Sequence, residues 1–216
     1  MILKREFYTR DAVTVAKELL GKILVKEKEG ILFKGRIIET EAYMGAVDKA
    51  SHSYGNRKTK RTEVMYKEGG YSYVFLIYGM YECFNVTAAE KGNPEAVLIR
   101  AVEPVENIEL MREIRKTKKD RDISNGPGKL TKALGILRED NGIDVTEGKN
   151  IWIEDDGYKV GKITATTRIG IDYAEEDAEK PWRFYITENL YVSKKIEVKK
   201  KDKDLQENRK IWYNFS

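Results

Sequence analysis

Cysteine, histidine and long apolar runs are all scarce in this sequence. Cys83 is the only cysteine in 216 residues, so the chain cannot form an internal disulfide, and a buried thiol in a reducing compartment is expected. With one histidine beside that cysteine there is no Cys/His cluster for zinc, and we expect neither a metal nor an organic cofactor. No stretch approaches the ~20 apolar residues of a membrane span, and no signal-like apolar run opens the chain. These absences predict a soluble, intracellular protein with no membrane partner, and we expect a cytoplasmic location in a prokaryote.

Positive charge is in slight excess, and it is unevenly placed. The 40 basic and 36 acidic residues give a net charge of +4. Residues 194–210 hold eight Lys or Arg against four Asp or Glu, which equals the whole excess. Residues 49–67 form a second basic stretch, whereas residues 172–179 are acidic. A charge run is usually a solvated face, but basic excess beside an acidic patch favours an oriented polyanionic partner.

Apolar periodicity predicts a single α+β domain over residues 1–193, followed by a basic extension with an apolar end over residues 194–216. Strands and helices do not alternate as βαβ units, so we expect a mainly antiparallel, curved sheet with flanking helices and a protruding hairpin. The expected helices are 11–20, about three turns opening at Pro104, and 128–135; the expected strands are 22–26, 31–43, 71–77, 80–87, 96–102, 151–154, 163–168 and 183–186.

The end of the strand 31–43 carries two carboxylates and a phenol. In Glu39-Thr40-Glu41-Ala42-Tyr43, strand alternation places Glu39, Glu41 and Tyr43 on one face. Such an end could be a solvated edge. His52, the only histidine, follows nine residues later inside a long polar, basic loop, where a polyanion could approach. A lone histidine is more often structural than catalytic, but this position favours a functional one.

Aromatic residues gather in the next segment, 71–81. Five of these eleven residues are aromatic, and alternation would place most of them on one face of a core strand. Tyr78 is different because it stands beside Gly79 at the expected hairpin tip, where a large ring has no core to join. An exposed ring beside arginines can wedge a base stack or stack on an extruded base.

Together with the segments below, these residues resemble the alkyladenine (3-methyladenine) DNA glycosylase family. The resemblance runs in order from about Phe7 to Ser193. It is carried by eight motifs: Glu39-Thr40-Glu41-Ala42-Tyr43, Ala50-Ser51-His52-Ser53, Ile77-Tyr78-Gly79-Met80-Tyr81, Cys83-Phe84-Asn85-Val86, Val97-Leu98-Ile99-Arg100-Ala101-Val102-Glu103-Pro104, Asn125-Gly126-Pro127-Gly128-Lys129-Leu130, Arg168-Ile169-Gly170 and Lys180-Pro181-Trp182-Arg183-Phe184-Tyr185. Each motif alone is weak, but eight in register are specific.

The resemblance implies a catalytic group built on one carboxylate. Glu41 matches the family's catalytic residue, which activates a water for attack at C1′ of the deoxyribose. Arg100 and the main-chain carbonyl of Ile169 match groups that help to hold that water. No lysine matches a Schiff-base residue, so the resemblance implies base release without strand cleavage.

The resemblance also implies a base pocket. The flipped base should stack between Tyr43 on one side and His52 with Phe75 on the other, with the main chain at His52 reading its edge. Asn85 matches the residue that disfavours the exocyclic amino group of guanine. Phe75 stands where some relatives have tyrosine, so it keeps a stacking face and lacks a hydroxyl.

Contacts to the duplex follow from the same match. Tyr78 matches the wedge that fills the gap left by the flipped nucleotide, and Met80 and Tyr81 belong to the same DNA-contacting tip. Arg57 and Lys129 resemble phosphate contacts. The implied substrate is therefore duplex DNA with a damaged purine, such as 3-methyladenine, 7-methylguanine, hypoxanthine or ethenoadenine, bound by a monomer.

Two other functions remain open from the residues alone. A non-catalytic binder of flipped or damaged bases would share the aromatic residues, but would gain nothing from Glu41 near phosphates. A carbohydrate glycosidase could use Glu39 and Glu41 as an acid/base pair. Residues two apart on a strand point the same way, however, and leave no room for a sugar between them.

Tyr78 generates the first test, because a wedge and a core residue respond differently to truncation. If Tyr78 is a wedge, Tyr78→Ala lowers single-turnover base release from duplex DNA by ~1–3 kcal/mol of lost stacking, and costs much less on single-stranded DNA. If it is a core residue, the cavity lowers the free energy of unfolding by ~3–5 kcal/mol and both rates fall equally. Thermal unfolding and the two rates, measured on the same lesion, decide between them.

Overall fold

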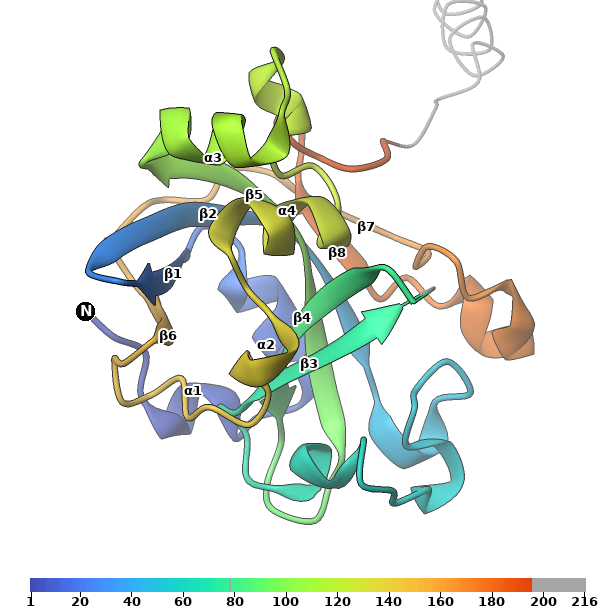
Figure 1. Cartoon of the computed structure of the whole chain (residues 1–216). Coiled ribbons are helices and arrows are strands. Elements are labelled where there is room, and N and C mark those ends of the chain that lie inside the picture. The colour runs from blue at the N-terminus through green and yellow to red at the C-terminus, as the bar shows by residue number, and fades with distance from the viewer. Residues whose placement is uncertain (78, 196–216) are drawn as a thin grey trace, which may run out of the picture.

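The computed structural model describes residues 1–77 and 79–195 (Figure 1). Its α-helices are α1 (Arg5–Tyr8), α2 (Ala12–Leu19), α3 (Ile108–Arg115) and α4 (Pro127–Leu134). Its strands are β1 (Ile23–Lys28), β2 (Ile31–Tyr43), β3 (Ser72–Ile77), β4 (Tyr81–Ala88), β5 (Glu95–Glu106), β6 (Ile151–Glu154), β7 (Ile163–Thr166) and β8 (Arg183–Ile186). Short 3-10 turns lie at Gly45–Val47, Tyr54–Asn56, Glu63–Tyr66, Asp120–Asp122, Arg138–Asp140 and Asp172–Glu179.

A curved antiparallel sheet organises the chain, as the sequence predicts. Its strand order is β3-β4-β5-β2-β1-β6, and β8 pairs with both β2 and β7. β2 is central because it pairs through residues 34–43 with β5, through residues 31–36 with β1 and through residues 39–41 with β8. The α+β prediction is confirmed.

The two faces of β2 have different surroundings: one packs on the main core and on α2, and the other carries the polar residues of the strand end. Ile38 and Ala42 are fully buried in the main core, and the Thr40 hydroxyl donates to the Ala16 carbonyl of α2 at 2.9 Å. α2 begins where the Asp11 side chain accepts the Thr14 amide at 2.9 Å, a cap that stabilises a helix by about 1 kcal/mol. Because successive side chains alternate, Glu39, Glu41 and Tyr43 are directed away from α2.

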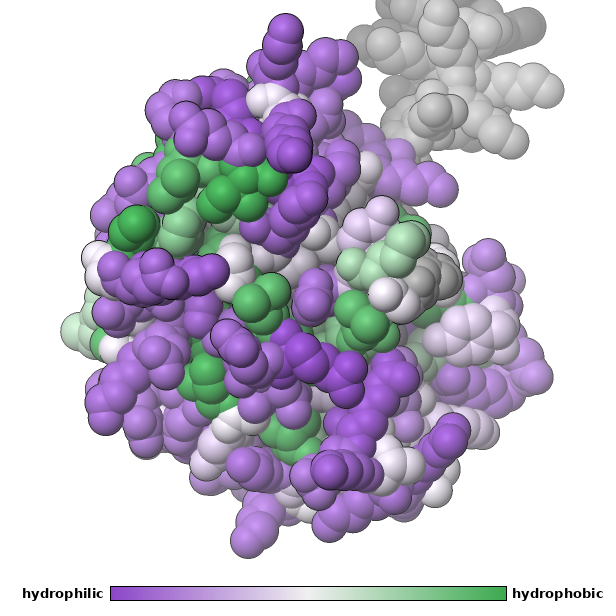
Figure 2. All heavy atoms as spheres, viewed as in Figure 1, coloured by the Kyte–Doolittle hydropathy of each residue, from purple (hydrophilic) through white to green (hydrophobic). Residues whose placement is uncertain are grey.

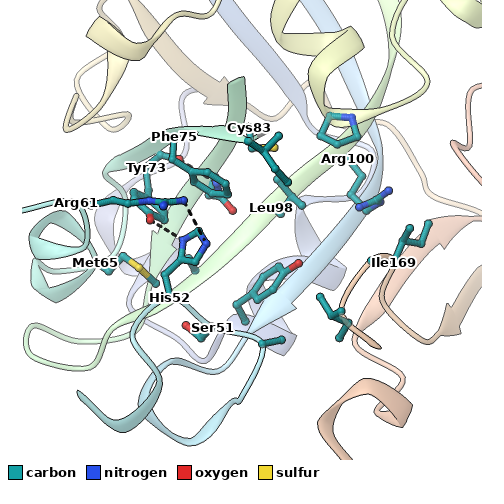
Figure 3. Close-up of a pocket in the computed structure, with 18 of the residues that line it drawn as sticks. Ser51, His52, Arg61, Met65, Tyr73, Phe75, Cys83, Leu98, Arg100 and Ile169 are labelled. Atoms are coloured by element: carbon teal, nitrogen blue, oxygen red, sulfur yellow. Dashed lines mark hydrogen bonds between the residues drawn. The ribbon is translucent and has the colours of Figure 1, made fainter. Parts of the chain in front are cut away.

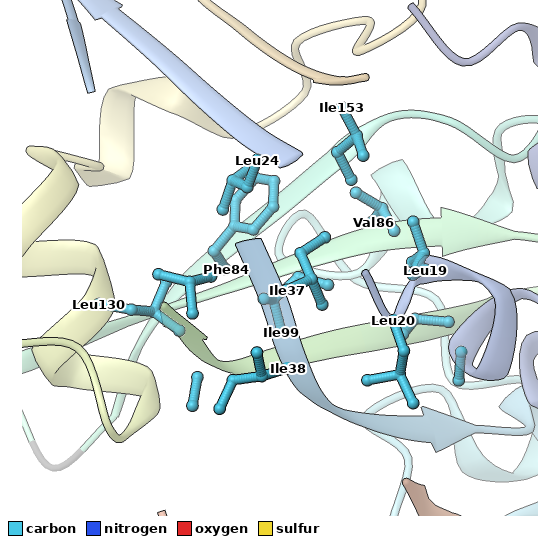
Figure 4. Packing of buried hydrophobic residues seen from close by; sticks show 14 of the residues in the cluster. Leu19, Leu20, Leu24, Ile37, Ile38, Phe84, Val86, Ile99, Leu130 and Ile153 are labelled. Atoms are coloured by element: carbon cyan, nitrogen blue, oxygen red, sulfur yellow. The ribbon is translucent and has the colours of Figure 1, made fainter. Parts of the chain in front are cut away.

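The main core lies between the sheet and the helices that cover it. Phe84, Ile37 and Ile99 pack together at its centre with no solvent exposure (Figure 4). The outer surface is mainly hydrophilic in the view of Figure 2, with apolar side chains gathering between α3 and α4. No helix in the described part of the chain is long and apolar enough to cross a membrane.

One predicted helix start is wrong. Pro104 does not open a helix but lies inside β5, opposite Gly35 and beside an irregularity in the β2–β5 register. Proline lacks an amide hydrogen and is tolerated in a strand where the ladder is interrupted. The chain turns only at Asn107, whose φ of 58° is left-handed, so α3 begins at Ile108 and is shorter than predicted.

The hairpin and the loops that follow β2 and β7 lie on one side of the molecule (Figure 1). β3 and β4 pair from Ser72↔Val86 to Ile77↔Tyr81, as the sequence predicts. Gly79 has a φ of 68°, which only glycine adopts without cost. Gly128 of α4 packs so closely on Tyr81 that a Cβ there would meet the Tyr81 Cβ at 2.9 Å, which explains a glycine at the start of this helix.

Candidate active site

A cavity of about 160 Å³ opens between the hairpin, the loop after β2 and the segment after β7 (Figure 3). β3 contributes Tyr73, Phe75 and Ile77, which are alternate residues and share one face as predicted. The other lining residues are Tyr43, Ala50, Ser51, His52, Arg61, Met65, Cys83, Asn85, Ala96, Leu98, Arg100, Pro127, Ile169, Gly170, Ile171 and Tyr173. Sequence-distant segments thus supply one mostly apolar cavity with a few polar groups.

Glu41 is fully buried directly behind three of the lining residues. The Ile169 amide donates to Glu41 Oε1 at 2.8 Å, and the Tyr43 hydroxyl donates to Oε2 at 2.9 Å. Arg100 Nη1 lies 3.3 Å from Oε1. A carboxylate with these partners is fixed in orientation and keeps lone pairs that can accept a proton. The contact from Ile169 is made by its amide, and the expected role of its carbonyl stays a prediction.

Glu39 is equally buried and, like Glu41, is not itself a lining residue of the cavity, but its hydrogen-bond partners differ. Its Oε1 accepts Arg100 Nε at 3.0 Å, Arg183 Nη1 at 2.9 Å and the Ser193 hydroxyl at 2.8 Å. Its Oε2 accepts the Ser193 amide at 2.6 Å. Arg183 Nη1 also donates to the Lys194 carbonyl at 2.9 Å, so the end of the described chain closes this network. Glu39 is thus a partner of Arg100 and not a second acid/base group.

The charges of this network balance. Burial opposes the charge on Arg100, but the carboxylates of Glu41 and Glu39 raise its pKa above the usual value. Burial, followed by the negative charge of Glu41, raises the pKa of Tyr43 well above that of a free phenol. Tyr43 therefore stays a neutral hydrogen-bond donor to Glu41.

The ring of Tyr43 is backed by a second buried ion pair. The Arg168 Cζ lies 4.8 Å from the Tyr43 ring centroid. Arg168 is held by Asp48 through bonds of 2.6 and 2.9 Å, and it donates to the Ala42 carbonyl at 3.0 Å. Tyr43 is therefore fixed on the side of β2, where it forms one wall of the cavity.

Another part of the cavity wall is formed by His52, Tyr73 and Phe75, which lie side by side (Figure 3). The ring centroids of His52 and Phe75 are 4.6 Å apart in an edge arrangement, and His52 Nδ1 lies 2.8 Å from the Tyr73 hydroxyl. Arg61 Nη2 donates to His52 Nε2 at 3.3 Å. Because Arg61 donates to Nε2, Nε2 must be the acceptor nitrogen of the imidazole. Nδ1 therefore carries the proton and donates to the Tyr73 hydroxyl.

Other predicted residues fall around this cavity. Asn85 lines it with its Nδ2 bonded to the Tyr73 carbonyl at 3.0 Å, and its expected role in base selection stays a prediction. Met80 and Tyr81 are exposed at the hairpin tip. Tyr78, between them and β3, lies outside the described residues.

The two predicted phosphate contacts lie in different surroundings. Arg57 is exposed and lines a second cavity of about 360 Å³, next to the first and sharing His52 and Arg61 with it. Lys129 donates to Asn125 Oδ1 at 2.7 Å and lies 3.8 Å from Asp122, so part of its charge is already compensated. Contact with phosphates stays a prediction for both.

Comparison with known proteins identifies the family. The family model described as methylpurine-DNA glycosylase (MPG) matches residues 6–190. The chain belongs to this family. A protein of Clostridium botulinum (strain Alaska E43 / Type E3) is 54% identical over 205 residues, covering 90% of this chain and 100% of that protein. A protein of Clostridium novyi (strain NT) is 55% identical over 201 residues, covering 89% and 98%. Both are named "Putative 3-methyladenine DNA glycosylase".

The chain is thus a hydrolase of N-glycosyl bonds, and the predicted enzyme class is confirmed. Within residues 1–77 and 79–195 no group of three or more His, Cys, Asp or Glu side chains could hold a metal ion. Cys83 lines the cavity as a free thiol, and burial raises its pKa to about 11. It stays protonated at neutral pH and belongs to the wall.

Sequence reasoning missed four residues of this glycosylase site. Arg168 and Arg183 stand in recognised motifs, but nothing in the sequence shows which carboxylates they pair with. Ser193 is a single serine near the end of the resemblance and gives no local signal. Arg61 is one of several cations in the basic loop, and only the fold brings it against His52.

His52 gives a direct test of this environment. Burial, with the positive charges of Arg61 and Arg57, lowers the pKa of His52 to about 4. Because it is the only histidine, its ring protons give one NMR titration in the full chain, with an expected midpoint near 4. The unfolded chain takes up this proton first, so stability decreases as the pH falls from about 6.5 to about 4. Arg61→Met should raise the midpoint. A wild-type midpoint near 6.5 contradicts the described packing.

Proposed function

We propose that this chain is a monofunctional DNA-repair N-glycosylase. Acting as a monomer on duplex DNA, it flips out an alkylated or deaminated purine, hydrolyses the bond to deoxyribose and leaves an abasic site. The observation that carries the proposal is Glu41, a buried carboxylate held by three donors behind an aromatic-walled cavity. Such a group has little use in a protein that only binds, because burying a charge is costly.

The fold suggests how the substrate reaches that carboxylate. A base inside the helical stack is inaccessible, so the nucleotide must rotate out at a cost of a few kcal/mol, which is smallest for a damaged pair. Tyr43 on one wall and His52 with Phe75 on the other offer faces for the extruded base. Basic side chains of the loop after β2 lie at the same side of the molecule, where they can attract the phosphates.

Glu41 then acts as the general base. Its carboxylate accepts a proton from a water, the water oxygen bonds to C1′, and the C1′–N bond breaks with its electron pair going to the base. Arg100 and the Ile169 amide hold the carboxylate in place during this transfer. No lysine of the described chain lines the cavity, so the residues offer no amine for an imine and for strand cleavage.

The charge of the base determines how readily it leaves when the bond to deoxyribose breaks. Purines alkylated at N3 or N7, such as 3-methyladenine and 7-methylguanine, are cationic, so they stack well on aromatic faces and leave easily. Hypoxanthine and ethenoadenine are neutral and poorer leaving groups. We include both classes among the substrates. A carbohydrate substrate is disfavoured because both oxygens of Glu39 are occupied by Arg100, Arg183 and Ser193.

A panel of duplex oligonucleotides, each containing one of these four bases, tests the proposal. The full chain is expected to release at least one alkylated base, and the strand should break only after alkaline treatment. An undamaged duplex of the same sequence is the control. Release of no base from any member, by a chain shown to be folded, would sink the proposal.

Glu41→Gln tests the assigned base. The substitution keeps the size and the hydrogen-bond acceptor but cannot take a proton, so single-turnover release should fall by ~10²–10⁴-fold. Affinity for lesion-containing duplex should hold or rise, because one negative charge near phosphates is removed. If Glu41→Gln releases base as fast as the wild type, the general base lies elsewhere.

A further inference from the structure

Arg61 lies against the wall of the cavity formed by Phe75 and His52. Its Cζ is 4.9 Å from the Phe75 ring centroid, and its Nη2 is 3.3 Å from His52 Nε2. Figure 3 shows its side chain extended from the loop toward both rings. Arg61 lines both the cavity of about 160 Å³ in the candidate active site and the neighbouring cavity of about 360 Å³, so its charge lies at the boundary between them.

Two other arginines beside the cavity are compensated by carboxylates. Arg100 is paired with Glu39 and Glu41, and Arg168 with Asp48. Arg61 makes no ion pair with any carboxylate of residues 1–77 and 79–195. Its contacts are with the Phe75 ring, the neutral His52 and the Tyr73 hydroxyl. Of the two arginines that line this cavity, Arg61 is therefore the one whose charge is not paired with a carboxylate of the described residues.

We infer that Arg61 accelerates base release electrostatically, by stabilising the electron pair that moves onto the departing base. The inference rests on the proposed function. When the C1′–N bond breaks, the pair goes to the base nitrogen, so a cationic base becomes neutral and a neutral base becomes an anion. The sugar carbon, on the Glu41 side, becomes more positive. In both classes the base gains one negative charge, and a fixed cation beside it stabilises the transition state more than the bound state.

The two substrate classes then differ in binding but not in this rate effect. A cationic base is repelled by Arg61 in the bound state, so Arg61 opposes its binding while it favours its release. A neutral base has no such repulsion. Arg61 thus favours the binding of neutral bases over that of cationic bases, and it accelerates the release of both classes. A residue that only supported the packing of Phe75 and His52 would not separate binding from rate in this way.

The experiment uses the full chain and three variants. Arg61→Met keeps the length of the side chain and removes the charge, whereas Arg61→Lys keeps the charge. Lys60→Met is the matched control, because Lys60 is an exposed cation of the same loop and lines neither cavity. Rates at saturating enzyme and dissociation constants are measured on duplexes containing 7-methylguanine or hypoxanthine, and thermal unfolding verifies the fold.

For Arg61→Met we expect the rate at saturation to fall by about 10- to 100-fold on both bases, as a charge several ångströms away would cause. Arg61→Lys should restore most of this rate. Relative to Lys60→Met, affinity should improve for the 7-methylguanine duplex and not for the hypoxanthine duplex. An unchanged rate on either base, or a loss that Arg61→Lys does not restore, overturns the inference. If the wild type releases neither base, the proposed function fails instead.

Discussion

The guanidinium of Arg100 joins two buried carboxylates, and the rest of the site depends on this contact. It binds Glu39 through Nε and approaches Glu41 through Nη1, in a region without solvent exposure for either carboxylate. An isolated charge could not be buried there, because its desolvation would cost several kcal/mol. Arg183 supplies the second positive charge and makes the cluster neutral overall. Glu41, the proposed general base, is therefore held within a balanced set of charges and not by a single partner.

Pairing within the sheet brings these charged side chains together. β2 carries both carboxylates, β5 on one side carries Arg100 and β8 carries Arg183. The β2–β5 register is irregular between Ile37 and Thr40, and strand alternation keeps Glu39 and Glu41 on the same side, while Thr40 bonds to α2 behind them. The segment ending at Lys195 returns to this place, so Ser193 closes the network with a residue far from β2 in the chain. The fold thus brings β5, β8 and the segment at Ser193 to the two carboxylates of β2.

The sequence predicts most of this where the signal is local. Strand alternation places Glu39, Glu41 and Tyr43 together, Gly79 marks the hairpin, and the structure has both features. The predicted helix start at Pro104 was wrong. Proline is common in the first turn of helices, whereas here an interrupted β ladder accommodates it. Arg61, Arg168 and Ser193 act through partners far away in sequence, so no periodicity identifies them. The expected division at residues 193 and 194 falls beside Ser193, and residues 196–216 lie outside the described part.

A double-mutant cycle on the free energy of unfolding tests the balanced-charge account most directly. Glu39→Gln leaves two guanidinium groups with one carboxylate, Arg183→Met leaves two carboxylates with one guanidinium, and the double variant keeps the pair of Arg100 and Glu41. Removing one partner of a buried ion pair costs about 3–5 kcal/mol. The account therefore predicts that the double variant is destabilised by clearly less than the sum of the two single variants. Destabilisations that simply add up would contradict it.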